Sequence, residues 1–165
     1  MSVIIKDREL DRNATTNRKM LESSYLMGQR DFSHSYLQHI CLHKAHLANI
    51  NLSNAYLNRA ILSKANLEEA YLNRAVLYAA NLNRANLYRS SLIEANLEKA
   101  NLSHAILNHA NLSRANLKNA NLQDAQLVWA NLQWANLKDA NLEGVNLSGA
   151  RFYQTIMPDG SIRNS

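Results

Sequence analysis

A strict period of five residues runs through most of this 165-residue chain and limits what it can fold into. Leu occupies every fifth position from Leu37 to Leu147, with Phe32 before and Phe152 after, making 25 repeats in one unbroken register. Two places before these centres, from position 45 onward, 19 of 22 residues are Ala. The residue between Ala and Leu is Asn in 13 repeats. A pattern this regular requires the same backbone shape in every repeat.

Neither regular secondary structure accommodates that period. On an α-helix five residues advance by about 500°, so the Leu side chains would spread around every side of the helix. On a flat strand an odd period places successive Leu residues on opposite faces. The pattern therefore predicts a chain that turns a corner once per repeat and winds into a solenoid. Leu and Ala would point inward, the other three residues outward, and strand-like hydrogen bonds would join successive coils.

Segments such as ANLNRANLYRS, ANLEKANLSHA and ANLKNANLQDA resemble the pentapeptide repeat family. The resemblance covers residues 30 to about 154. It implies an all-β fold, a right-handed quadrilateral β-helix with four repeats per coil and about six coils. The segments GQRDFSHSYL and RFYQTIMPDGSIRN resemble the ends of bacterial members, the second those of cyanobacteria, which points to a cyanobacterial source.

The chain divides by composition into four parts. We expect a flexible arm over residues 1–15, a capping helix over 16–28, the β-helix over 29–154 and a tail over 155–165. A solenoid needs covered ends because its last coil exposes unpaired backbone groups and apolar side chains.

The expected capping helix has local start and stop signals. Thr16 or Asn17 is suited to the N-cap, and Gly28 is placed to end the helix. The residues expected to cover the first coil fall on one helical face: Met20, Leu21, Ser24 and Met27.

The chain shows no signal peptide, and no stretch is long enough to span a membrane. Its single cysteine, Cys41, favours a reducing compartment, so we expect a cytoplasmic protein without a membrane partner.

Histidines cluster near the start of the repeats, but the solenoid separates them: His34, His39, His43 and His46. A metal site needs ligands that converge on one ion, whereas these side chains should point outward from different sides of one coil. The sequence also lacks a nucleophile–base pair and a Gly-rich phosphate loop. We therefore expect no metal, no cofactor and no enzymatic activity.

Four repeats per coil would stack residues twenty apart on one side. Arg74, Glu94 and Arg114 should then pair along the rod, and Tyr36 should stack on Tyr56. Large exposed aromatic side chains mark interfaces more often than chance. The candidate interaction surface comprises Trp129, Trp134, Arg74, Arg84, Arg89 and Tyr88.

The favoured function is a rigid scaffold that binds an as yet unidentified protein partner. The protein would be a monomer or an end-to-end homodimer, paired through a hydrophobic end coil near Phe152, Tyr153, Ile156 and Met157.

The alternative function involves nucleic acid. Direct binding would use a basic belt: Arg59, Lys64, Arg74, Arg84 and Arg89, with Tyr71, Tyr78 and Tyr88. Some family members inhibit DNA gyrase by resembling DNA, which requires a strongly negative surface. The net charge of +5 and the isoelectric point near 9.5 have the wrong sign for that mimicry.

Overall fold

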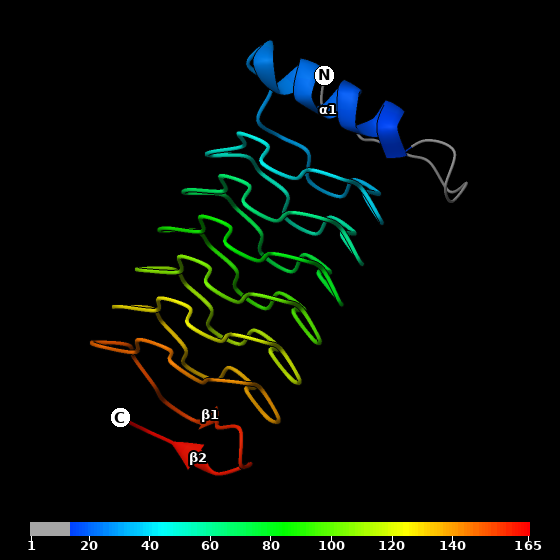
Figure 1. Ribbon diagram of the computed structural model, residues 1–165. Helices are drawn as coiled ribbons and strands as arrows, with labels where there is room; N and C mark the ends of the chain where they lie inside the picture. Colours follow the sequence, from blue (N-terminus) through cyan, green and yellow to red (C-terminus); the bar gives the residue numbers. More distant parts are fainter. Residues whose placement is uncertain (1–13) are drawn as a thin grey trace.

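The computed structural model describes residues 14–165, most of which wind into a stack of coils (Figure 1). Parallel β-bridges join residues twenty apart, from Asp31 and Asn51 at one end to Asn136 and Ile156 at the other. Each coil therefore contains four five-residue repeats. A turn follows every Leu centre, so the predicted corner in each repeat is confirmed.

Each corner is a four-residue β-turn that begins at a Leu centre. In one example the Ala80 N–H donates to the Leu77 carbonyl at 3.0 Å. Of the two central residues only the second, Ala79, has a positive φ, at 53°, which is characteristic of a type II turn. The same position in other repeats carries Arg, Lys, His or Trp, although the left-handed conformation costs such residues about 1 kcal/mol each.

The interior of the coils matches the sequence pattern. Every Leu centre from Leu37 to Leu137 is at most 1% exposed, and the Ala positions beside them are buried as well. Two exceptions in the Ala column are also buried, Ile50 and Ser90. The Ser90 hydroxyl donates to the Leu87 carbonyl at 2.8 Å, which satisfies its polar group inside the core.

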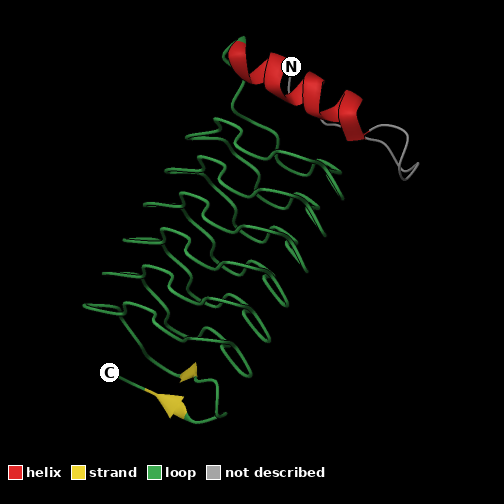
Figure 2. Cartoon of the chain, in the orientation of Figure 1, coloured by secondary structure: helices red, strands yellow, loops and turns green. Residues whose placement is uncertain are grey.

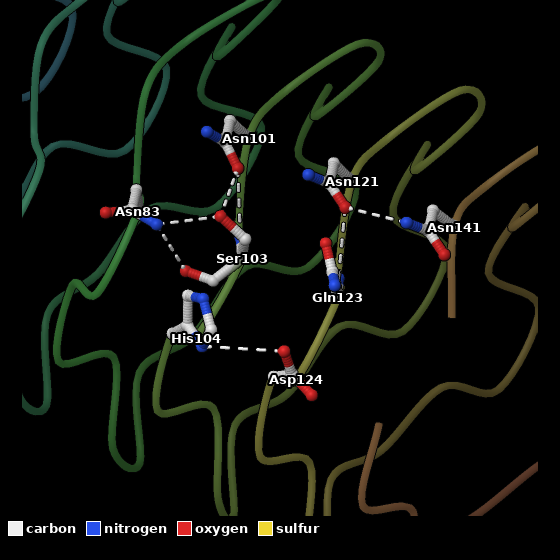
Figure 3. Close-up of polar contacts among 8 residues, drawn as sticks. All are labelled: Asn83, Asn101, Ser103, His104, Asn121, Gln123, Asp124 and Asn141. Atoms are coloured by element: carbon white, nitrogen blue, oxygen red, sulfur yellow. Dashed lines mark hydrogen bonds and ion pairs between the residues drawn. The ribbon is translucent and has the colours of Figure 1, made fainter. Parts of the chain in front are cut away.

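The frequent Asn before each Leu has a structural reason. Its side-chain oxygen accepts a hydrogen bond from the backbone N–H two residues ahead, at 3.0 Å from Asn101 to Ser103 and 3.1 Å from Asn121 to Gln123 (Figure 3). This Asx-type contact satisfies an N–H of the turn that the backbone hydrogen bonds between coils leave unpaired. Stacked Asn side chains also bond one another, as from Asn141 Nδ2 to Asn121 Oδ1 at 3.2 Å (Figure 3).

Continuous strands are scarce among the described residues. Two short strands, β1 (Thr155–Ile156) and β2 (Ile162–Arg163), pair in antiparallel fashion after the last repeat. The sides of the coils consist of single-residue bridges rather than strands (Figure 2). The predicted all-β fold is therefore seen in the strand-like hydrogen bonds between coils more than in the number of strands. A corner every five residues leaves little extended backbone on each side of a coil.

The helix α1 (Ala14–Leu26) starts and ends two residues earlier than the predicted range of 16–28. Neither Thr16 nor Asn17 is its N-cap, because both lie inside the helix. The predicted arm over residues 1–15 falls outside the described residues, except that Ala14 and Thr15 belong to α1.

Gly28 ends α1 as predicted. Its φ is 96°, its N–H donates to the Tyr25 carbonyl at 3.0 Å, and the Gln29 N–H donates to the Ser24 carbonyl at 3.0 Å. These two bonds form a Schellman motif, which places Gly28 just beyond the last helical residues and explains why α1 stops at Leu26.

The prediction of which helical face covers the first coil is only partly correct. Leu21 is fully buried, but Met20 and Met27 are exposed. The second contact comes from Tyr25, one turn after Leu21, whose hydroxyl donates to the Ala48 carbonyl at 2.8 Å. Met27 lies beyond the end of the helix and therefore does not share its face.

The helix α1 and the β1–β2 hairpin lie at opposite ends of the stack (Figure 1). No helix among residues 14–165 is long and apolar enough to cross a membrane.

Candidate interaction surface

One column of outward side chains forms a continuous ladder along the rod. Arg74 Nε lies 2.8 Å from Glu94 Oε2, and Arg114 Nη1 lies 3.9 Å from Glu94 Oε1. The Arg114 guanidinium carbon lies 5.4 Å from the Trp134 ring centroid. The Trp134 ring meets Tyr153 edge to face at 5.2 Å. The predicted pairing of Arg74, Glu94 and Arg114 is confirmed, and it ends on an aromatic pair.

A second ladder runs beside the first, one corner earlier in each coil. Arg89 Nη1 lies 3.9 Å from Glu69 Oε1, and the Arg89 guanidinium sits 5.0 Å from the Tyr88 ring centroid. The Tyr88 ring meets His109 edge to face at 5.6 Å. Trp129 occupies the next position of the same column, twenty residues after His109. This ladder also passes from charged pairs to aromatic side chains toward the C-terminal end.

The structure thus gathers five of the six predicted surface residues into two neighbouring columns. Arg84 is the exception, because it lies in the column of Lys64 and His104, one corner before the column of Arg89 and two corners from that of Arg74. In that column His104 Nδ1 lies 3.8 Å from Asp124 Oδ2 (Figure 3). Arg84 therefore lies beside the second ladder and on the opposite side of the rod from Arg74.

The C-terminal parts of the two columns form one surface, which we call the Trp face: residues 107–115, 127–135 and 147–155. Within it Trp129 is 63% exposed, Trp134 46% and Tyr153 47%. These three segments contain Arg114, Arg151 and no Asp or Glu. The acids of the same coils lie on the other sides: Asp124, Asp139 and Glu143. Large aromatic rings and positive charge therefore coincide on a surface without internal acids.

A hollow of about 420 Å³ opens on the Trp face. Its lining comes from three successive coils: His109, Ala110, Asn111, Trp129, Asn131 and Arg151. The Trp129 ring is held over Gly149, where a Cβ atom would lie 2.5 Å from ring atom Cε3. The absence of a side chain at Gly149 therefore sets the position of one wall.

Arg114, Tyr153, His109 and Arg151 were absent from the predicted surface. The signal for Arg151 is visible in the sequence, since it stands where the column of Asn111 and Asn131 would place another Asn. The role of Gly149 follows only from the twenty-residue stacking of the coils.

One of the histidines near the start of the repeats contacts the next coil. His43 Nδ1 lies 2.7 Å from Ser63 Oγ. Among residues 14–165 no three His, Cys, Asp or Glu side chains lie close enough together to hold a metal ion.

The predicted stack of Tyr36 on Tyr56 is confirmed, with ring centroids 4.9 Å apart and planes within 4°. The predicted hydrophobic end coil is found in part. Phe152 is largely buried, with the Arg163 guanidinium 3.7 Å from its ring centroid, whereas Tyr153 is exposed. Met157 is partly buried against the core, as are four residues earlier in the chain: Leu142, Val145, Leu147 and Ala150. End-to-end pairing of two rods stays a prediction.

Comparison with known proteins identifies the family. The model of pentapeptide repeats matches in eight copies, over residues 40–78, 70–108, 95–133 and 125–159. The chain belongs to the pentapeptide repeat family. Its solved members are right-handed quadrilateral β-helices, in agreement with the four repeats per coil seen here. No curated protein sequence matches this pentapeptide repeat chain.

Among solved structures, the pentapeptide repeat protein Rfr23 from the cyanobacterium Cyanothece 51142 is 30% identical, with a TM-score of 0.51. The match covers 84% of this chain and 99% of Rfr23. HetL, involved in heterocyst differentiation regulation in the cyanobacterium Nostoc sp. strain PCC 7120, is 28% identical over 87% of this chain and 98% of HetL, with a TM-score of 0.29. The fluoroquinolone resistance protein QnrB1 is 17% identical over 74% of this chain and 79% of QnrB1, with a TM-score of 0.37. The last two TM-scores are too low to support an inference for this pentapeptide repeat chain.

Proposed function

We propose that this pentapeptide repeat protein is a non-catalytic scaffold that binds another protein through the Trp face. The observation that supports the proposal most is the exposure of Trp129, Trp134 and Tyr153 on a surface that carries Arg114 and Arg151 but no acid. Trp, Tyr and Arg dominate the binding energy of protein interfaces, because their large side chains lose much water-exposed area when a partner covers them.

A rigid support makes such a surface useful. At twenty residues per coil, the bridges between residues 31 and 156 correspond to about six coils, or a rod about 30 Å long. We propose that α1 caps the first coil, supported by the buried Leu21 and the hydrogen bond from Tyr25 to Ala48. A capped rod presents its side chains at fixed spacings, which lowers the entropy lost when a partner binds.

A nucleic-acid partner has less support. Arg74 and Arg89 of the basic belt are paired with Glu94 and Glu69, which reduces the charge available to phosphates. Lys44, Lys64 and Arg84 stack in one column on another side of the rod, but the next member of that column, His104, lies 3.8 Å from Asp124. A nucleic-acid strand would need cations beyond these three to neutralise more of its successive phosphates.

Affinity capture from the source organism with three forms of the protein tests the proposal. The first is wild type, and the second is the double variant Trp129→Ala and Trp134→Ala. The third is the control Ile61→Ala, which removes a large exposed apolar side chain from another side of the rod. We expect a partner protein that wild type and the control retain and the double variant loses.

Circular dichroism and thermal unfolding of the double variant show whether its coils remain intact. Retention of the same proteins by all three forms would overturn the proposal. Nuclease treatment of the lysate separates a direct protein partner from one that is held through nucleic acid.

A further inference from the structure

The hollow on the Trp face is lined by hydrogen-bond donors. Its lining includes Asn111, Asn131, His109, Trp129 and Arg151. Arg151 has five N–H donors, the Trp129 indole has one, and each Asn amide has two. The residues in the hollow include no carboxylate that would occupy these donors.

The orientation of both Asn amides follows from the fold. Asn111 Oδ1 accepts from the Ser113 N–H at 3.1 Å, and Asn131 Oδ1 accepts from the Gln133 N–H at 3.1 Å. A backbone N–H needs an acceptor, so the oxygen of each amide must face the turn. The NH₂ group then faces away from it. In other ladders this group donates to the next Asn, as from Asn141 to Asn121, but no such bond joins Asn131 and Asn111 within residues 14–165.

Arg151 is the cation of the hollow that lacks a counter-charge. No ion pair or side-chain hydrogen bond engages its guanidinium among the described residues. Arg114, the other Arg on the Trp face, already interacts with Glu94 and Trp134. The guanidinium of Arg151 therefore remains available to an anion, and its planar fork matches the two oxygens of a carboxylate.

We propose that this hollow binds the carboxylate of an Asp or Glu side chain on an acidic segment of the partner protein. The inference rests on the proposed function, because it names the chemistry of the partner at the same surface. The Trp129 ring forms an apolar wall beside the donors, which suits a segment in which an apolar residue flanks the acid. One unpaired guanidinium fits one carboxylate, whereas a nucleic-acid backbone presents a row of phosphates.

A titration with model peptides tests the inference. The probe is a capped peptide of alternating Leu and Glu, and the comparison peptide carries Gln in place of Glu. Two further probes, sodium acetate alone and single-stranded oligothymidine, distinguish a free carboxylate and a nucleic acid from an acidic segment. The chain has two Trp residues, so the indole N–H resonances of Trp129 and Trp134 report by NMR where each probe binds.

We expect the Leu/Glu peptide to shift the Trp129 resonance in a saturable way and the Leu/Gln peptide to have a much smaller effect. Arg151→Gln should weaken peptide binding about tenfold, because a charge-assisted hydrogen bond is lost. The control Arg59→Gln removes the same charge from another side of the rod and should leave the affinity unchanged.

The inference is overturned if both peptides bind equally, if Arg151→Gln binds like wild type, or if no saturable shift occurs over the solubility range of the peptide. Tighter, salt-sensitive binding of oligothymidine would replace it with a nucleic-acid site. Acetate binding as tight as the peptide would replace it with a small-carboxylate site. If the double Trp variant loses a captured protein that Arg151→Gln retains, the scaffold stands and the carboxylate site is overturned.

Discussion

The indole ring of Trp129 rests against the backbone of Gly149, twenty residues later and one coil further along. A Cβ atom on Gly149 would lie 2.5 Å from Cε3, 2.6 Å from Cδ2 and 2.8 Å from Cζ3 of the ring. Real Cβ atoms do not approach other atoms so closely, so any side chain at position 149 would displace the ring. The lack of a side chain at Gly149 thus leaves the space that the ring of Trp129, the more exposed Trp of the Trp face, occupies.

We therefore predict that Gly149→Ala moves Trp129 out of its position. In a Trp134→Phe background Trp129 is the single Trp, so its fluorescence emission should shift and its indole N–H resonance should move. The matched control is Gly160→Ala, since Gly160 also has a positive φ, of 84°, but has no atom within 4 Å of the Cβ position. Both variants carry the backbone strain of about 1 kcal/mol. Identical Trp129 spectra in both variants would contradict the contact.

Two adjacent Ala residues should respond differently to the same substitution. Ala79 is the left-handed residue of its turn, with φ at 53°, whereas Ala80 points into the core and is 1% exposed. Ala79→Gly relieves the strain of the turn but loosens the unfolded chain, and should leave the free energy of unfolding unchanged or raise it by up to about 1 kcal/mol.

Ala80→Gly removes a buried methyl group as well as loosening the unfolded chain. It should lower the free energy of unfolding by about 1–2 kcal/mol. Denaturant unfolding of both variants measures the difference between them. Equal destabilisation by the two substitutions would show that the left-handed turn carries no strain at this position.

The interior of the rod was predictable because it repeats. A period of five excludes a helix and a strand, which leaves a corner in each repeat with Leu and Ala inside. The pairing of Arg74 with Glu94 and the stack of Tyr36 on Tyr56 followed once four repeats per coil were taken from the family resemblance. The helix boundaries were less predictable, because Thr16 and Asn17 have the side chains of N-caps but lie inside α1.

The hollow on the Trp face could not be read from the sequence, since it depends on relationships between coils. Gly149 matters because it lies beside Trp129, and this contact becomes visible only when residues twenty apart are stacked on one another. The donors of Asn111 and Asn131 face outward because a turn N–H binds each amide oxygen. Such orientations depend on backbone geometry, which five-residue patterns do not specify.

The turn of the C-terminal hairpin should respond to acid. Hydrogen bonds from Ser161, from Oγ at 2.6 Å and from the backbone N–H at 2.9 Å, hold the pKa of Asp159 below its ordinary value. Because the folded-state pKa lies below the unfolded one, the stabilisation is present above the ordinary value of about 3.9. It is lost as the pH falls through the lower folded-state value.

The amide resonance of Ser161, followed by NMR during an acid titration, measures that pKa. We expect its midpoint below that of an unfolded Asp, and Asp159→Asn should abolish the transition while it keeps an acceptor oxygen. An ordinary Asp midpoint at Ser161 would rule out the hydrogen bonds as the cause.

Core truncations should cost less at the C-terminal end of the rod than in its middle. Leu102 and Leu142 occupy the same inward column two coils apart, but Leu102 is fully buried and Leu142 only partly. Leu102→Ala should lower the free energy of unfolding by about 3–5 kcal/mol, because it leaves a cavity between two covering coils. Leu142→Ala should cost about 1–2 kcal/mol, because that site already contacts water.

In a solenoid each coil is stabilised mainly by its neighbours, so the end variant should fray locally. Trp fluorescence, which reports on the C-terminal coils, should then change at a lower denaturant concentration than circular dichroism does. Equal costs for the two truncations, or coincident transitions for Leu142→Ala, would show that the last coil is as well covered as the middle of the rod.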